Sequence, residues 1–282
     1  MRSWTMASPL IAPEDLLPVI GEAILLDCRP RAAYDEGHLP GALHVDTEQH
    51  LSRAGEEGFD PARGGRHPLP DLKAFCAQVG RWGIAPDSWV VVYDGHGGAN
   101  AAARCWWMLR SLGHEKLQVL DGGLQALVEL GAKLTSEAPN CVAAPIYPSN
   151  YWRLTTVDIE VVEKLAHHDD WKVIDVRAGV RYRGEQETLD PVAGHIPGAL
   201  NLPYEQNLGH RGRFKPQEEL RQLYEDLLDG TRADHAVFSC GSGVTACHGL
   251  LALLHAGFGD GVLYVGSWSE WCRSGKPQAT GA

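Results

Sequence analysis

The sequence predicts an α/β protein of two similar domains, each a mainly parallel sheet flanked by helices. Its 282 residues are enough for two domains of about 100–200 residues each. The chain also repeats itself, because the motif Gly-His-Leu-Pro-Gly-Ala-Leu at residues 37–43 returns as Gly-His-Ile-Pro-Gly-Ala-Leu at residues 194–200. In both halves short apolar runs alternate with helical stretches, which is the pattern of parallel strands joined by helices.

Two pairs of matching apolar runs predict strands in the two halves. Residues 25–29 and 173–177 each end in Asp-x-Arg, and residues 89–94 and 236–240 each lead into a glycine-containing turn. Short apolar runs of this kind are typical of strands that are buried on both faces of a sheet. We therefore expect two sheets built from equivalent strands.

Helical stretches follow the second run in each half, from Asn100 to Leu112 and from Val244 to His255. Residues 117–123 then match residues 262–267, so the motifs keep one order in both halves. The same order of motifs predicts the same topology in the two domains.

The domain boundary is predicted between residues 135 and 153, where prolines interrupt any regular element. We expect an N-terminal domain over residues 10–138, a linker over residues 139–153 and a C-terminal domain over residues 154–276. The prolines in this stretch are Pro139, Pro145 and Pro148.

Composition and charge narrow the possible partners. The chain is 44% hydrophobic and 22% charged, as is usual for a folded globular protein. Its 25 Lys and Arg against 36 Asp and Glu give a formal charge of −11, which would repel nucleic acid and anionic membrane surfaces. No run of about 18 apolar residues occurs, so no membrane span is expected.

The cysteine pattern and the N-terminal residues favour a cytoplasmic protein. Seven cysteines at irregular spacing suit reduced thiols better than a disulfide framework. No Cys-x-x-Cys pair occurs, so we expect no metal site of the usual zinc spacing. The first fifteen residues contain no apolar run long enough for a signal peptide.

Cys240 is the candidate nucleophile. It ends a predicted strand, and Gly241, Ser242 and Gly243 follow it before the next helix. Ligands bind at strand ends of open α/β sheets, and a glycine-rich turn at a helix N-terminus turns its N–H groups toward an anion. The same field stabilises a thiolate. An isolated buried cysteine would ordinarily be a small core residue, but the two glycines favour the functional interpretation.

Other residues of the loop are expected to contribute to substrate binding. We assign this role to Gly241, Gly243, Val244 and Thr245. Cys247 lies two helical turns from Cys240 and is expected in the core rather than as a resolving thiol.

Asp94 is the first-half counterpart of Cys240. A carboxylate there can cap the following helix but supplies no sulfur nucleophile. The N-terminal domain is therefore expected to be catalytically inert.

These motifs together resemble the tandem-domain sulfurtransferases of the rhodanese superfamily, over residues 10–276. Within that superfamily, the Cys-Gly-Ser-Gly-Val-Thr loop at residues 240–245 resembles the loop of 3-mercaptopyruvate sulfurtransferases, whereas thiosulfate-preferring enzymes typically carry Arg and Lys after the cysteine. The resemblance implies two rhodanese-like domains and transfer of a sulfane sulfur from 3-mercaptopyruvate, through a Cys240 persulfide, to a thiol. Pyruvate would be released, and no cofactor would be needed. Thioredoxin or a small thiol would be the acceptor, and cyanide would serve in the test tube.

The resemblance also implies roles for further residues. Arg181 matches the family's substrate-binding arginine, and it would orient the donor carboxylate. A second arginine is usual about nine positions later, but Asp190 stands near there. Arg183 could substitute for it.

By the same resemblance, a Ser-His-Asp relay that activates the substrate would use Ser242, His38 and Asp27, with Asp27 preferred to Asp35. A structural role is the alternative for His38, since His195 occupies the same place in the second half. Asp27 has the same alternative, because Asp175 is its repeat equivalent.

Three other functions share some of these sequence features. A thiosulfate:cyanide sulfurtransferase is favoured by the missing second arginine and disfavoured by the loop sequence. A non-catalytic persulfide carrier would keep Cys240 reactive without needing Arg181. A phosphatase of the Cys-x5-Arg type is excluded because position 246 is Ala246, which cannot bind phosphate oxygens.

Overall fold

The computed structural model describes residues 8–99 and 101–281, and they form two compact units. Of the described residues, unit 1 contains 8–51, 70–99, 101–153 and 210–214, and unit 2 contains 52–69, 154–209 and 215–281. The division therefore crosses the chain several times, whereas the sequence suggested a single linker. Asn100, the first residue of one predicted helix, lies outside the described residues, as do residues 1–7 and 282.

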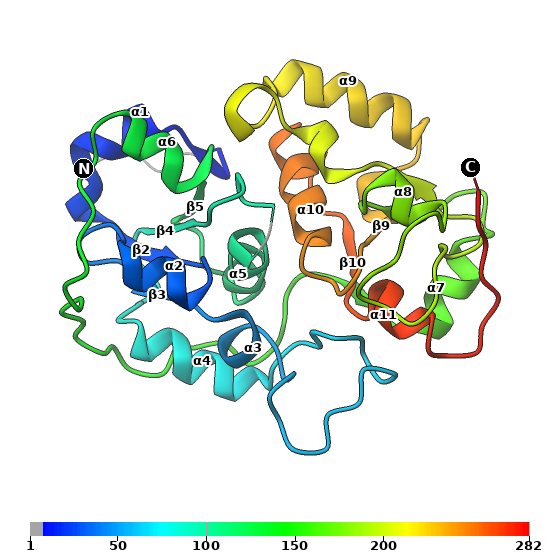
Figure 1. Ribbon diagram of the computed structural model, residues 1–282, viewed down its shortest axis with the longest axis horizontal. Helices are drawn as coiled ribbons and strands as arrows, with labels where there is room; N and C mark the ends of the chain where they lie inside the picture. The colour runs from blue at the N-terminus through cyan, green and yellow to red at the C-terminus, as the bar shows by residue number, and fades with distance from the viewer. Residues whose placement is uncertain (1–7, 100, 282) are drawn as a thin grey trace. The chain divides into compact units, whose positions relative to one another are not determined.

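Unit 1 is built on a five-stranded sheet with the strand order β1-β5-β4-β2-β3 (Figure 1). All of its strand pairs are parallel, and Ile24 of β2 is paired with Val90 of β4. Every residue of β4 is buried, which fits its run of three valines. The strands are β1 Leu10–Ile11, β2 Ile24–Asp27, β3 Leu43–His44, β4 Val90–Tyr93 and β5 Leu117–Leu120.

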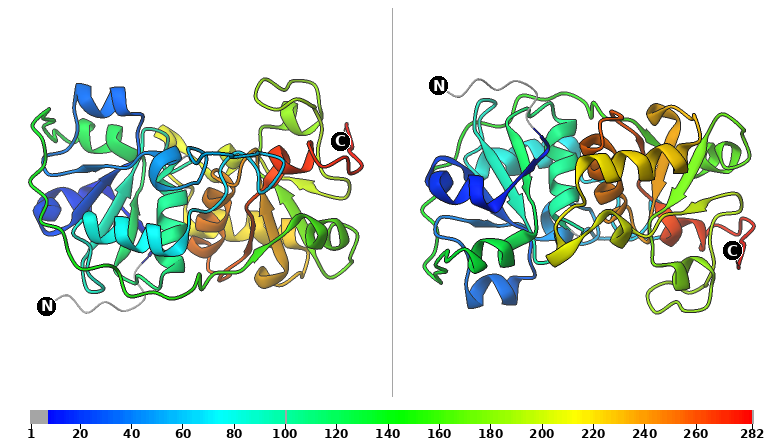
Figure 2. Two further views of the ribbon diagram at one scale, coloured as in Figure 1. Left: turned by 90° about the horizontal axis from the view of Figure 1, so that it is seen from below. Right: turned by 90° about the horizontal axis from the view of Figure 1, so that it is seen from above.

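Helices cover both faces of this sheet (Figures 1 and 2). One core packs Leu16 and Leu127 against Val91 and Leu120 of the sheet. The helices are α1 Pro13–Leu16, η1 Leu17–Glu22, α2 Arg31–Glu36, α3 Thr47–His50, α4 Leu72–Arg81, α5 Ala101–Ser111 and α6 Gly123–Glu129.

Unit 2 repeats the design with the strand order β6-β10-β9-β7-β8, again with parallel pairs throughout. Lys172 of β7 is paired with Ala236 of β9, which is the register of β2 on β4. The strands are β6 Thr156–Val157, β7 Lys172–Asp175, β8 Leu200–Asn201, β9 Ala236–Ser239 and β10 Val262–Tyr264. Two parallel sheets with one order confirm the predicted fold class.

The core of unit 2 packs Val162 of α7 and Trp268 of α11 against Val173 and Val237 of the sheet. Figure 1 shows α9 and α10 on one side of this sheet, with α7 on the other. The helices of unit 2 are α7 Ile159–Leu165, α8 Gly179–Tyr182, η2 Tyr204–Asn207, α9 Gln217–Leu228, η4 Ala233–His235, α10 Ala246–His255 and α11 Ser267–Trp271, whereas η3 His210–Gly212 belongs to unit 1.

Helix α10 begins at Ala246, two residues later than the sequence predicted. Gly243 has a left-handed φ of 75°, so the chain turns there before it can enter a helix. Val244 and Thr245 then form a tight first turn, because their carbonyls accept from Cys247 and His248 three residues on.

Each unit also takes in one short segment from the other half of the sequence. Residues 52–69, which follow β3 and α3, belong to unit 2, and residues 210–214, which follow β8, belong to unit 1. In unit 1 the Phe214 N–H donates to Asp121 Oδ1 at 2.8 Å, and Arg213 pairs with Glu14 at 2.7 Å. The segment after the β3 or β8 strand of each repeat therefore belongs to the unit that the other repeat forms, and we call each such segment an arm.

No helix in the described part of the chain is long and apolar enough to span a bilayer. Among the same residues, no group of three or more His, Cys, Asp or Glu side chains is arranged to hold a metal ion.

Candidate active site

Cys240 follows β9 at the carboxyl edge of the unit 2 sheet, and only 2% of its surface is exposed. Its N–H donates to Ser267 Oγ at 3.0 Å, and its carbonyl accepts from the Trp268 N–H at 3.0 Å. Both partners belong to α11, the helix that follows β10. Hydrogen bonds to the first two residues of α11 thus fix the main chain at Cys240 without a substrate.

Ser267 adopts a conformation that favours glycine, with a φ of 52°. Its hydroxyl donates to the Tyr264 carbonyl at 2.9 Å while it accepts from Cys240. The equivalent residue of unit 1, Gly123, has a φ of 65°. A left-handed serine costs about 1–2 kcal/mol, and its two hydrogen bonds offset this strain beside the candidate nucleophile.

In the equivalent loop of unit 1, backbone N–H groups bind the Asp94 carboxylate. Its carboxylate accepts from the N–H groups of His96 at 2.8 Å and Gly98 at 2.9 Å, and from Ala102 in α5 at 3.3 Å. The predicted capping role of Asp94 is thereby confirmed. The loop of unit 1 is an anion site that is already filled by its own side chain.

The Cys240 loop offers similar donors. Ser242 and Val244 stand two and four residues after Cys240, as His96 and Gly98 do after Asp94. Among the described residues, the backbone N–H groups of Ser242 and Val244 have no acceptor. An anion that replaces the missing carboxylate would therefore find N–H groups at the same positions of the loop.

Gly243 fixes the shape of the loop. It has a φ of 75°, and a Cβ atom there would lie 2.3 Å from the Val265 carbonyl oxygen. The Cys247 Sγ–H donates to the Gly243 carbonyl at 3.4 Å, and Cys247 is fully buried. These contacts support a core role for Cys247.

The Ser242 hydroxyl lies 2.8 Å from Nδ1 of His67. His67 belongs to residues 52–69, the arm that unit 2 takes from the first repeat. Sequence reasoning missed His67 because this arm carries none of the repeated motifs. The signals that could have found it are the Gly64-Gly65 pair just before it and the proline just after it, which mark a turn built for close approach.

His38 and Asp27, the other two members of the predicted relay, lie in unit 1. His38 Nδ1 lies 3.0 Å from the Tyr34 carbonyl, and its Nε2 lies 3.1 Å from the Glu137 carbonyl. Asp27 accepts from the Arg29 guanidinium, at 2.7 Å from Nη2. The two predicted relay members are thus each bonded to other groups of unit 1, and the structure does not join them to one another.

His195 and Asp175, the equivalents of His38 and Asp27 in unit 2, make similar contacts although no relay is predicted for them. His195 Nδ1 lies 2.8 Å from the Tyr182 carbonyl oxygen. The His195 ring stacks on the Tyr182 ring with 3.7 Å between the ring centroids, as the His38 ring stacks on that of Tyr34 at 3.9 Å. The Arg177 guanidinium holds Asp175 at 2.6 Å. It also donates to the carbonyl of the glycine before His195, as Arg29 does to the glycine before His38. This repetition favours the structural alternative, and the relay through His38 stays a prediction.

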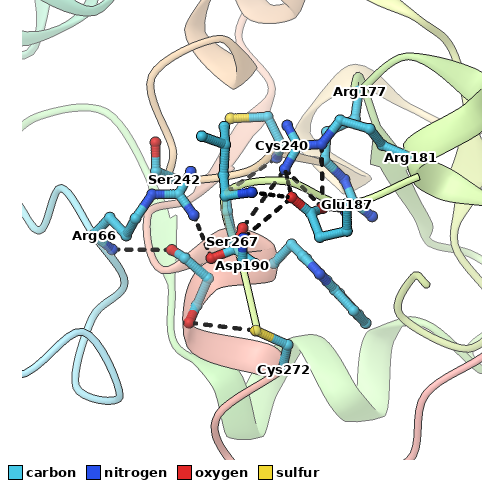
Figure 3. Close-up of polar contacts among 12 residues, drawn as sticks. Arg66, Arg177, Arg181, Glu187, Asp190, Cys240, Ser242, Ser267 and Cys272 are labelled. Atoms are coloured by element: carbon cyan, nitrogen blue, oxygen red, sulfur yellow. Dashed lines mark hydrogen bonds and ion pairs between the residues drawn. The ribbon is translucent and has the colours of Figure 1, made fainter. Parts of the chain in front are cut away.

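Arg181 lies close to the loop, as expected, but it is already paired. Its Nε and Nη2 donate to the Glu187 carboxylate at 2.8–3.1 Å (Figure 3). Burial acts to raise the pKa of Glu187, but the Leu189 N–H and the Arg181 guanidinium lower it more, so this carboxylate is held ionised. Arg183 pairs with Glu185 at the surface at 2.7 Å, and its role as the second substrate arginine stays a prediction.

Arg177 is the second guanidinium near Cys240 (Figure 3). Burial acts to lower the pKa of Arg177, but the Asp175 carboxylate outweighs burial and the pKa is raised. Attraction to Glu187 and to Cys240 adds to this rise. Arg177 is therefore held as a cation beside the Cys240 loop.

Asp190, which stands where a second arginine was expected, is buried among arginines. Its carboxylate pairs with Arg66 and with Arg273, the latter at 2.9 Å, and lies 3.6 Å from Arg181 Nη2. Asp190 is therefore not a lone acid in the site, because guanidinium groups surround its carboxylate.

Comparison with known proteins identifies the family of the chain. Residues 13–130 and 158–274 each match the family described as Rhodanese-like domain. The chain is 41% identical over 270 residues to "Probable 3-mercaptopyruvate sulfurtransferase" of Pseudomonas aeruginosa, covering 92% of this chain and 93% of that protein. It is 34% identical over 250 residues to thiosulfate sulfurtransferase of Gallus gallus, covering 88% and 83%.

A solved structure is similar as well. The 3-mercaptopyruvate sulfurtransferase from Leishmania major matches with a TM-score of 0.82 and 29% identity, covering 96% of this chain and 76% of that one. The matches span both halves, as the motif resemblance predicted. The chain therefore belongs to the rhodanese-like family of sulfurtransferases and carries the family's domain twice.

Proposed function

We propose that the protein is a 3-mercaptopyruvate sulfurtransferase that transfers sulfur through a persulfide on Cys240 to a thiol acceptor. The observation that carries this proposal is the contrast between the two loops. The loop of unit 1 binds its own Asp94 carboxylate, whereas the Cys240 loop has a sulfur at that position. The N–H groups of Ser242 and Val244 have no acceptor within the described residues. Backbone N–H groups in such a loop stabilise a thiolate and the persulfide anion that forms from it.

In the first half-reaction the Cys240 thiolate attacks the sulfur of 3-mercaptopyruvate. The sulfur–sulfur bond forms as the carbon–sulfur bond breaks, and the electron pair of that bond goes to the pyruvate enolate. A proton then converts the enolate to pyruvate. Ser242, hydrogen-bonded to His67, is the group close to Cys240 that is suited to move this proton.

In the second half-reaction an acceptor thiolate attacks the outer sulfur of the persulfide. The acceptor leaves as a persulfide, and the electron pair returns to the Cys240 thiolate. The two halves predict ping-pong kinetics. Thioredoxin and small thiols remain the proposed physiological acceptors, with cyanide as the acceptor in an assay.

Thiosulfate as the sulfur donor is the second candidate. It is supported by the thiosulfate sulfurtransferases among the relatives and by the arginines around Asp190, which could attract a dianion. A persulfide carrier without turnover is the non-enzymatic alternative.

Steady-state transfer to cyanide with both donors distinguishes these candidates. We expect a higher kcat/KM with 3-mercaptopyruvate and no turnover in Cys240→Ser. A higher kcat/KM with thiosulfate would replace the proposed donor. Loading of Cys240 by either donor without turnover would favour the carrier.

A further inference from the structure

The segment before His67 is held firmly on unit 2. The Gly64 N–H donates to Glu270 Oε1 at 2.8 Å, and the Arg66 N–H donates to Ser269 Oγ at 2.9 Å. Between them Gly65 has a φ of 79°, and a Cβ atom there would lie 2.3 Å from the Gly266 carbonyl oxygen. The main chain is thus fixed at the residue that carries the Arg66 side chain.

The Arg66 side chain is fixed as well. Its Nη1 donates to Asp190 Oδ1 (Figure 3). The same carboxylate oxygen also accepts from Arg273 Nη1 at 2.9 Å. The Asp190 side chain is fully buried, so its charge needs these partners. Asp190 therefore sets the direction of the Arg66 guanidinium.

The unused ends of two guanidinium groups converge beside the Cys240 loop. A Cβ atom on Gly241 would lie 3.2 Å from Arg66 Nη2 and 3.5 Å from Arg181 Nη1. Asp190 occupies the other end of Arg66, and Glu187 occupies the Nε and Nη2 of Arg181. Within the described part of the chain, neither of the two facing nitrogens has an acceptor.

We propose that Arg66 and Arg181 together bind the anionic group of the sulfur donor, and that Asp190 is a positioning residue for Arg66. Arg66 thus supplies, from the first repeat, the second arginine that position 190 lacks. The ligand class is a small carboxylate with one negative charge. This inference rests on the proposed function for the identity of the donor, but not for the existence of the anion site.

Charge decides between a carboxylate and a dianion. The arginines of the cluster are Arg66, Arg177, Arg181 and Arg273, and its carboxylates are Asp175, Glu187 and Asp190. Four positive charges against three negative ones leave an excess of one before the charge of the Cys240 thiolate is counted. With so small an excess, a monoanion such as 3-mercaptopyruvate or pyruvate leaves less unbalanced negative charge in the cluster than thiosulfate does.

The test measures equilibrium binding of pyruvate to full-length protein by calorimetry, in a Cys240→Ser background that cannot turn over. Loss of one charge-assisted hydrogen bond in Arg66→Met should weaken pyruvate binding by about 10- to 100-fold. Arg63→Met is the matched control, because it removes the same charge from the same arm at an exposed position. It should change binding by less than about twofold. Pyruvamide, which lacks the carboxylate charge, should bind equally weakly with and without Arg66.

A second measurement separates binding from damage to the loop. With Cys240 intact and loaded as the persulfide, transfer to the uncharged thiol 2-mercaptoethanol needs no carboxylate site. Arg66→Met should leave this rate unchanged while KM for the donor rises. Asp190→Asn keeps an oxygen acceptor but loses the charge, so it should raise KM by about three- to tenfold with kcat and the thiol step unchanged.

The inference is overturned if Arg66→Met binds pyruvate as tightly as Arg63→Met does. It is also overturned if Arg66→Met slows the thiol step as much as it raises KM, because the arginine would then only support the loop. Failure of the wild type to turn over 3-mercaptopyruvate would refute the proposed function, while pyruvate binding would still decide the role of Arg66.

Discussion

The loop conformation at Gly243 makes a sharp prediction about the substitution Gly243→Ala. Alanine in the left-handed region costs about 1–2 kcal/mol. Its Cβ would in addition lie 2.3 Å from the Val265 carbonyl oxygen, about 1 Å inside ordinary contact, and overpacking of this kind costs about 1–3 kcal/mol. The total expected loss is therefore about 2–5 kcal/mol in the free energy of unfolding.

Gly257→Ala is the matched control. Gly257 also has a left-handed φ, of 92°, but a Cβ there would meet nothing closer than Gln217 Nε2 at 3.7 Å. It should lose only the conformational part, about 1–2 kcal/mol. The difference between the variants isolates the contact with Val265.

Urea denaturation of both variants, followed by circular dichroism, measures these losses, and sulfur transfer to cyanide measures the consequence for the site. Relief of the clash must move the loop by a distance of the order of 1 Å, so kcat/KM should fall about 100-fold in Gly243→Ala. In Gly257→Ala it should stay near the wild-type value. The reasoning is refuted if the two variants are equally stable and equally active.

Three further predictions concern polar groups. His67→Ala should lower kcat by about 100-fold or more, because Ser242 loses its proton partner, and His67→Asn should restore the hydrogen bond but not the rate. Glu187→Gln should cost about 1–3 kcal/mol at pH 7. Since the folded pKa of Glu187 is lowered, its contribution is lost as pH falls below 4.5, so the variant and wild type should converge there. His38→Gln should lower stability by about 1 kcal/mol with little change in kcat.

Each of these predictions has a contrary result. An active His67→Ala would remove Ser242 from proton transfer, and a steeper acid loss in Glu187→Gln than in wild type would reverse the assigned sign. A large fall in kcat in His38→Gln, at unchanged stability, would favour the predicted relay over the bracing role. Steady-state kinetics and urea denaturation across pH provide these measurements.

The fold was predictable because the two halves of the chain repeat the same motifs and can be compared with each other. Strands such as β4 and β9 are short apolar runs that recur in one order, and that order implies the same sheet twice. Cys240 was predictable for a local reason, since a strand end, two glycines and a helix start follow one another in the sequence.

The partners of Cys240 were harder to predict because they come from tertiary contacts. His67 and Arg66 lie on an arm without a repeated motif, and nothing local shows that unit 2 takes in this arm. His38 attracted attention because it is part of a repeated motif. The repetition itself points to a bracing role, because His195 makes the same Nδ1 contact and the same ring stacking in unit 2.

Asp190 illustrates a different limit. The sequence shows that an expected arginine is missing, but only the structure shows Arg66 and Arg273 on its carboxylate. A buried charge is compensated by whichever residues pack against it, and these can be distant in the chain. A single sequence does not record such pairs.

A single-turnover experiment tests the central claim most directly. Purified protein is mixed with one equivalent of 3-mercaptopyruvate and no acceptor, and intact-mass and peptide mass spectrometry are compared with pyruvate release. The account predicts one added sulfur atom on Cys240, one pyruvate per chain and neither in Cys240→Ser. Pyruvate release by Cys240→Ser, or sulfur on another cysteine such as Cys247 or Cys272, would contradict it.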